Sequence, residues 1–172
     1  ADTTLEALAA LKPVFSTKGS VTAGNSSQTT DGVAFVVVMA KSMVEELGLK
    51  PLGRLVSCSV AGVDPLYMGM GPCAAIPKAL GSAGLSLSDI SLVELNEAFA
   101  AQAIAVIREA GLDPAGVNVN GGAIALGHAL CCCVAILTMT LLRYLKERNH
   151  KYGIATACVG GGQGIAAVLE AF

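Results

Sequence analysis

Apolar residues along this chain fall into short β-branched runs and longer stretches with helical spacing. The β-branched runs predict strands at residues 32–39, 54–63, 90–95, 117–120, 154–158 and 165–170. Helical spacing, with proline or glycine at the ends, predicts helices at residues 42–47, 72–83, 96–110 and 128–146. Residues 1–22 have weak periodicity, so we expect an irregular segment there.

The alternation of strands and helices predicts an α/β fold, a layered mixed sheet with helices on both faces. The last two strands flank the glycine-rich residues 160–164 and should form a hairpin, which makes the sheet mixed. Residues 32–39 are apolar at nearly every position, so we expect a strand covered on both faces. We expect residues 1–30 to form a lead-in and a binding loop, and residues 31–172 the main domain.

Composition excludes some function classes. Of the 172 residues 53% are apolar and 14% charged, and the formal net charge is −2. Nucleic-acid binding needs a basic patch, which this composition does not offer. The longest apolar stretch, residues 129–142, is too short to span a bilayer. Because large apolar surfaces are uncommon on monomers, we expect a homo-oligomer.

Six cysteines are present, and three of them are adjacent at residues 131–133. Adjacent cysteines pair poorly, so we expect free thiols in a reducing, intracellular compartment. No metal site is expected, because His128 and His150 lie far apart and no C-x-x-C spacing repeats. Residues 1–11 lack the basic start of a signal peptide, and residues 169–172 lack a Ser-Lys-Leu peroxisomal address.

Three side chains at the ends of predicted elements could carry chemistry, and each has a structural alternative. Asn96 is either a helix N-cap or an amide that holds a water or a substrate carbonyl. His128 is either a packed histidine or a general base, kept neutral by the positive end of the helix it would open. Cys158 is either a small buried residue or an acid/base thiol, followed by glycines whose N–H groups could stabilise an oxyanion.

Taken in order, these segments resemble the signature set of the thiolase family. The matching motifs are Asn-Glu-Ala-Phe-Ala at residues 96–100, a Gly-Gly-Ala to Gly-His segment at 118–128 and Cys-x-Gly-Gly-Gly-x-Gly at 158–164. Residues 19–27 resemble the loop of that family that contacts coenzyme A. Met70-Gly71-Pro72 and Ile76-Pro77 also fit, particularly for the 3-ketoacyl-CoA branch.

The resemblance implies a role for each matching residue. His128 corresponds to the base that activates the acylated thiol, and Cys158 to the acid/base cysteine. Asn96 corresponds to the asparagine that, through a water, forms one oxyanion hole with His128, and Gly160 to a glycine of the other. No bound cofactor or metal is implied, and coenzyme A is a co-substrate. Its implied contacts are Phe15, Ala23, Gly24, Ser27, Ala98 and Phe99.

Two departures from the family pattern matter. The acylated cysteine of the family lies in an N-terminal domain, and no cysteine here sits in a similar motif. After His128 the family usually has Pro-Leu-Gly-x-x-Gly-Ala-Arg/Lys, whereas residues 129–136 are Ala-Leu-Cys-Cys-Cys-Val-Ala-Ile. Side chains in place of glycine at 131 and 134 predict overpacking, at about 1–3 kcal/mol. Ile136 also replaces a cation.

Three functions follow as hypotheses. The first is the C-terminal half of a 3-ketoacyl-CoA thiolase. It would need an N-terminal half to catalyse thiolytic cleavage of acyl-CoA substrates in fatty-acid β-oxidation, or the reverse Claisen condensation. The second is a non-catalytic module that binds coenzyme A. The third is a degenerate, structural or oligomerising fragment. We expect the cytoplasm or the peroxisome as the compartment.

Overall fold

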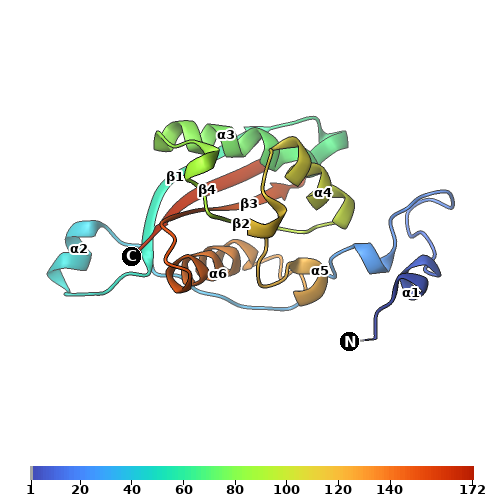
Figure 1. Ribbon diagram of the computed structural model, residues 1–172, viewed down its shortest axis with the longest axis horizontal. Coiled ribbons are helices and arrows are strands. Elements are labelled where there is room, and N and C mark those ends of the chain that lie inside the picture. Colours follow the sequence, from blue (N-terminus) through green and yellow to red (C-terminus); the bar gives the residue numbers. More distant parts are fainter. Residues whose placement is uncertain (1) are drawn as a thin grey trace.

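A four-stranded mixed sheet forms the centre of the computed structural model, which describes residues 2–172 (Figure 1). Its strands are β1 (Gly53–Gly62), β2 (Leu92–Leu95), β3 (Tyr152–Val159) and β4 (Gln163–Ala171), in the order β1-β4-β3-β2. β2 runs parallel to β3, while β4 is antiparallel to both β3 and β1. The predicted α/β class and the terminal hairpin are confirmed.

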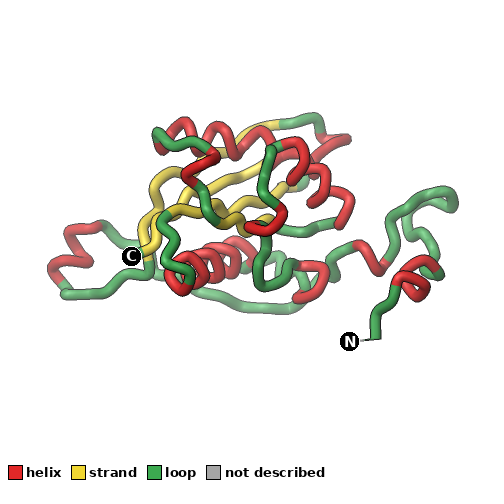
Figure 2. The backbone as a smooth tube through the Cα atoms, in the orientation of Figure 1, coloured by secondary structure: helices red, strands yellow, loops and turns green. Residues whose placement is uncertain are grey.

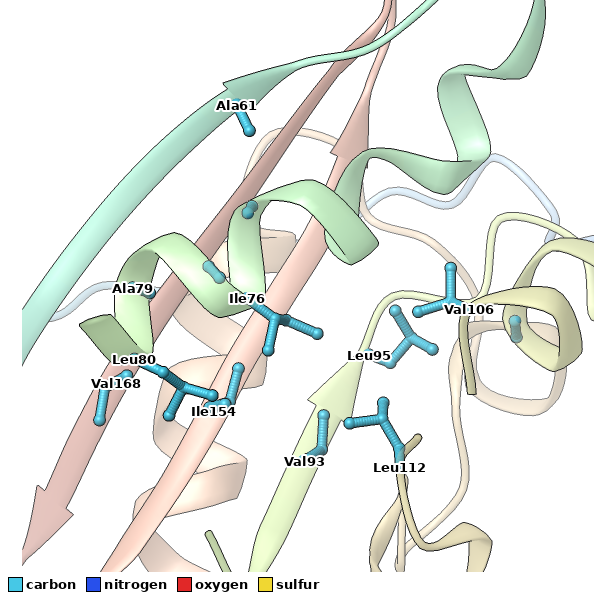
Figure 3. Packing of buried hydrophobic residues seen from close by; sticks show 13 residues of the cluster. Ala61, Ile76, Ala79, Leu80, Val93, Leu95, Val106, Leu112, Ile154 and Val168 are labelled. Atoms are coloured by element: carbon cyan, nitrogen blue, oxygen red, sulfur yellow. The ribbon is translucent and has the colours of Figure 1, made fainter. Parts of the chain in front are cut away.

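Helices cover both faces of this sheet, as predicted. α3 (Gly71–Ala83) and α4 (Ala100–Glu109) lie on one face, and α6 (Cys133–Glu147) lies on the other (Figure 1). The larger core cluster joins α3, α4 and the sheet, and Figure 3 shows Ile76, Leu95 and Val106 pointing into it. The smaller cluster joins α6 to the sheet through Leu141, Leu142 and Leu145.

Short elements connect these layers. The predicted helix at 42–47 is present as α2 (Lys41–Glu46). The segment predicted to be irregular holds a single turn of helix, α1 (Leu5–Ala9), because the Thr4 side chain accepts a hydrogen bond from the Ala7 N–H at 3.1 Å. The remaining short helices are η1 (Ala23–Asn25), η2 (Pro65–Met70), η3 (Leu87–Asp89), η4 (Pro114–Gly116) and α5 (Ala123–Leu126).

Residues 117–120 do not form the predicted strand. Val117 makes one isolated bridge to Val93, and the next residue, Asn118, has a positive φ of 47°, which ends the extended run. The Asn118 side chain then accepts from the Leu95 N–H and donates to the Leu95 carbonyl, both at 2.8 Å. An amide side chain therefore takes the place of strand pairing at this edge of the sheet.

The strand predicted at residues 32–39 is also absent. This segment is drawn as loop in Figure 2, and Phe35 and Val37 are 85% and 84% exposed. An apolar β-branched run becomes a strand only when a neighbouring strand pairs with its N–H and C=O groups. None of the described residues supplies that neighbour, so the segment stays unpaired.

Candidate active site

Asn96 directly follows β2 and is only 4% exposed. Its N–H donates to the Thr156 carbonyl at 3.0 Å and so extends the parallel pairing of β2 with β3. The prediction that Asn96 caps a helix is wrong, because α4 begins at Ala100 with Phe99 at the N-cap position. The Asn96 side chain is therefore available for another partner.

That partner is His128. The Asn96 Nδ2 and His128 Nε2 atoms are 3.5 Å apart, although 32 residues separate the two along the chain. The His128 backbone is held on both sides, since its N–H donates to Gln28 and its carbonyl accepts from Thr30. Gly127 before it has a φ of 93°, and a Cβ there would overlap the Thr30 side chain. The two polar candidates thus meet at the end of β2.

The prediction that His128 opens a helix is wrong, because α6 begins at Cys133. The helix end therefore cannot explain a neutral imidazole. Burial explains the neutral imidazole instead. It lowers the pKa of His128 below its ordinary value, because the charged form loses hydration. The Nδ1 atom is buried without a protein hydrogen-bond partner. Near pH 7 the imidazole is neutral and can accept a proton.

Glu97, the residue after Asn96, holds the loop that precedes His128. Its carboxylate accepts from the Asn118 amide at 3.2 Å and from the Ile124 N–H at 3.3 Å. A Cβ on Gly122 would overlap this carboxylate, so a larger residue there would displace the Glu97 side chain from these partners. Glu97 therefore fastens the glycine-rich loop that leads to His128.

Cys158 lies on the neighbouring strand β3, two residues beyond Thr156, to which the Asn96 N–H donates. It is half-buried, and burial raises the pKa of its thiol, with a further contribution from the nearby Cys133. The glycines that follow form the β3–β4 turn, and Gly161 has a φ of 87°. A Cβ on Gly160 would meet no atom within 4 Å, so the space beside it is open.

A cavity of about 80 Å³ lies between the end of β2, the loop before His128 and α6. Asn96 and His128 line it together with Cys133 and Thr140 of α6. Two more polar side chains, Asn120 and Glu94, complete the lining, and no motif in the sequence pointed to Glu94. A signal was present, since Glu94 is the one charged residue within the apolar run of residues 92–95.

The segment implied to contact coenzyme A packs along the start of α4. The Ser27 N–H and Oγ both donate to the Ala98 carbonyl, at 3.0 and 3.1 Å, and Ser26 forms a bridge with Phe99. The Phe15 and Phe99 rings meet edge to face, with centroids 6.4 Å apart.

Four of the six implied contact residues are therefore together: Phe15, Ser27, Ala98 and Phe99. The other two, Ala23 and Gly24, lie in η1. Ala23 is exposed, and a Cβ on Gly24 would come within 2.6 Å of the Leu8 side chain.

The overpacking predicted for the segment after His128 is not observed. Cys131 and Val134 are exposed, and the Cys131 Sγ lies 3.4 Å from the Gly32 carbonyl oxygen. Because both residues are exposed among the described residues, neither is pressed into a packed interior. Ile136, which stands where the family usually has a cation, lines the cavity.

Two further observations concern metals and membranes. Within residues 2–172 no group of three or more histidine, cysteine or acidic side chains is arranged to hold a metal ion. None of the helices in that part of the chain has both the length and the apolarity needed to cross a membrane.

Comparison with known proteins identifies the family. The family described as "Thiolase, C-terminal domain" matches residues 49–171, and "Thiolase, N-terminal domain" matches residues 1–42. The 3-ketoacyl-CoA thiolase of Bacillus subtilis (strain 168) is 56% identical over 168 residues, which are 98% of this chain and 43% of that protein. This chain thus spans less than half the length of the curated relatives it matches.

Solved structures agree. The acetyl-CoA acetyltransferase of Bacillus anthracis superposes with a TM-score of 0.97 at 52% identity, covering 100% of this chain and 44% of that one. Human mitochondrial 3-ketoacyl-CoA thiolase in complex with CoA superposes with a TM-score of 0.97 at 48% identity, covering 99% and 43%. Because the C-terminal domain match alone takes in most of its residues, the chain belongs to the thiolase family.

Proposed function

We propose that this chain is the C-terminal part of an acetyl-CoA C-acyltransferase of the thiolase type, which acts on 3-ketoacyl-CoA. The single observation that carries the proposal is the meeting of Asn96 and His128 at 3.5 Å, beside the end of the strand that holds Cys158. A base, an amide donor and a second thiol are the groups that carbon–carbon cleavage at a 3-ketoacyl thioester needs from this half of a site.

In the proposed reaction His128 Nε2 removes the proton from a nucleophilic thiol supplied by an N-terminal domain. The thiolate attacks the 3-keto carbon, and a water held by Asn96 and His128 donates to one developing oxyanion, with the Gly160 N–H at the other. When the C2–C3 bond breaks, the Cys158 thiol gives its proton to the departing carbanion. The thiol of coenzyme A then gives its proton to the Cys158 thiolate and attacks the acyl group, and the enzyme thiolate that leaves takes back the proton held by His128.

The raised pKa of Cys158 and the lowered pKa of His128 support these assignments. A thiol held protonated near pH 7 can act as the acid, while a neutral imidazole can act as the base. The reverse Claisen condensation uses the same groups in the opposite order. The proposal therefore covers both cleavage, as in fatty-acid β-oxidation, and synthesis.

Coenzyme A is proposed as the co-substrate. Its pantetheine would lie along the surface where residues 23–27 meet Ala98 and Phe99, with Phe15 at the edge. Support comes from the packing of these segments against each other within this chain, and from a relative that was solved with CoA. Homo-oligomerisation and a cytoplasmic or peroxisomal site belong to the same proposal.

A thiolase N-terminal domain is the proposed partner, within the same polypeptide or as a separate chain. Residues 1–42 match that domain, and residues 32–39 expose an unpaired apolar run. Such a run is suited to enter the sheet of the partner, because its N–H and C=O groups lack strand neighbours among residues 2–172.

Complementation tests the proposed function. This chain would be co-expressed with the part of the Bacillus subtilis relative that precedes the matched segment. Thiolysis of acetoacetyl-CoA by free coenzyme A would then be measured. We expect turnover from the pair, and a loss of about 10³-fold or more in His128→Ala, because the thiol then lacks its base.

His150→Ala is the matched control, since His150 is exposed and far from the cavity along the chain. Its rate should match the parent. No turnover from a folded pair would overturn the acyltransferase proposal. Binding of coenzyme A without turnover would favour the binding module, and neither property would favour the structural fragment.

A further inference from the structure

Glu94 is a buried carboxyl group beside the base. It belongs to β2, is 4% exposed, and lines the same cavity as Asn96 and His128. The reaction proposed above gives it no role. Burying a carboxylate is costly unless a cation or hydrogen-bond donors compensate it, so a buried carboxyl at this place needs a reason.

The alternation of side chains along β2 explains how Glu94 comes to face the cavity. Val93 and Leu95 point into the core cluster shared with α3 and α4, as Figure 3 shows. Leu92 packs in the other cluster, against α6. Since strand side chains alternate between faces, Glu94 is on the α6 side with Leu92, and Asn96 follows on that side.

The charged and titratable neighbours of Glu94 are few. The cavity presents His128 from the loop and Cys133 from α6, and Glu97 lies close enough to raise the pKa of Glu94. The β3 residues paired with β2, at positions 153–156, carry no titratable side chain. The cations of α6, Arg143 and Lys146, are exposed to solvent. Among the described residues that line the cavity, His128 is thus the one that can become a cation.

The cavity is large enough for water molecules that could link Glu94 to His128. Its volume of about 80 Å³ holds about two or three water molecules at roughly 30 Å³ each. Thr140, Asn120 and Asn96 offer polar groups around it. The buried Nδ1 atom of His128, which has no protein partner, also needs an acceptor when Nε2 is the basic nitrogen.

We propose that Glu94 is a positioning residue for the His128 base: as a carboxylate, reached through water in the shared cavity, it stabilises the imidazolium that forms when His128 accepts a thiol proton. The proton moves from the thiol sulfur to His128 Nε2, so a neutral thiol and imidazole become a thiolate and an imidazolium. Glu94 stays ionised throughout and faces the new positive charge. A carboxylate orients and stabilises a histidine base in the same way in a Ser-His-Asp triad.

The protonation energetics agree with this role. Burial and the neighbouring Glu97 raise the pKa of Glu94 to about 7, while burial lowers the pKa of His128. Glu94 is therefore ionised above about pH 7, where its negative charge can offset the cost of charging the buried imidazole. Such a pair titrates in joint steps, not as two independent groups.

An NMR pH titration of this chain is the first test, and it needs no activity. We expect the His128 ring resonances to move in two steps, one near pH 7 as the neighbouring Glu94 ionises and one lower as the ring itself is protonated, because groups that interact across a cavity titrate jointly. In Glu94→Gln only the lower step should remain. His150, which is exposed, serves as the internal reference. A single-step His128 titration in the parent chain would overturn the proposal.

The second test uses the complemented enzyme and rests on the proposed function. We expect Glu94→Gln to lower kcat about 10- to 100-fold at pH 8, while KM for coenzyme A changes less than about twofold. Glu94→Asp should restore part of kcat. Glu109→Gln, an exposed carboxyl on α4 across the sheet, is the matched control. An unchanged kcat in Glu94→Gln would contradict the positioning role.

The two tests separate the two proposals. If the complemented parent is inactive but His128 titrates in two steps, the acyltransferase proposal fails and the coupling of Glu94 to His128 stands. If the enzyme turns over but His128 titrates in one step, the positioning role fails alone. If Glu94→Gln does not fold, the titration of the parent chain still decides.

Discussion

At the scale of single residues, the environment of the strand end decides which candidate does chemistry. Asn96 was open to two interpretations, and continuation of the β2–β3 pairing leaves its side chain free to meet His128. His128 is kept neutral by burial and not by a helix end. Glu94 owes its place to alternation along β2. In each case the position of the backbone decides which partners and which protonation state one side chain has.

The buried carboxyl gives a prediction about stability. The pKa of Glu94 is raised in the folded state from 4.5 to about 7. Between these values the folded chain binds more protons than the unfolded chain, so its stability falls as pH rises. Glu94→Gln removes the buried charge, and we expect the Tm to rise by about 3–6 °C at pH 8 but hardly at pH 5.

Thermal unfolding followed by circular dichroism at the two pH values would measure this. Equal Tm gains at pH 5 and pH 8 would show that the charge of Glu94 is not responsible. Combined with a lower kcat, a pH-dependent gain in stability would mark a residue kept for function at a cost to the fold.

At the scale of elements, several close approaches depend on glycine. α3 starts against the first residues of β4, and a Cβ on Gly164 would overlap the Gly71 backbone. Backbone atoms cannot move aside as a side chain can. The docking of α3 on the sheet, and with it the larger core cluster, therefore requires glycine at this position.

Gly164→Ala should lower the free energy of unfolding by about 3 kcal/mol or more, because α3 must move away from β4. Gly81→Ala is the matched control: it lies within α3 with no atom within 4 Å of a new Cβ, and should be neutral or stabilising by up to about 1 kcal/mol. Urea titrations of both variants would measure this. Equal effects would contradict the close approach seen at Gly164.

At the scale of the whole molecule, the apolar run at residues 32–39 forms an exposed surface with no strand partner among the described residues. Phe35, Val37 and Val38 are more than four-fifths exposed. Exposed apolar strands with free N–H and C=O groups pair readily with other chains. We therefore expect this surface to promote self-association of the isolated chain and to bind the proposed thiolase N-terminal domain.

Val37→Asp should make this chain more monomeric and reduce complementation about tenfold or more, because a charge would be buried in the new sheet. Sedimentation velocity and the acetoacetyl-CoA assay would measure the two effects. Leu66→Asp replaces another highly exposed apolar residue and should alter neither. Undiminished complementation by Val37→Asp would contradict the role of this run.

The sequence by itself determined the fold class, most strands and helices, and the candidate residues, because hydrophobic periodicity and glycine or proline punctuation are local signals. The tertiary structure decided which segments find a strand partner and where each helix begins, because both depend on residues distant in the sequence. Residues 32–39 lack a strand partner, Asn118 replaces the strand at 117–120, and the helices after Asn96 and His128 begin four and five residues later than predicted. Long-range pairing also created the cavity that joins Glu94 to His128, and residue order alone cannot show which distant side chains share a buried space.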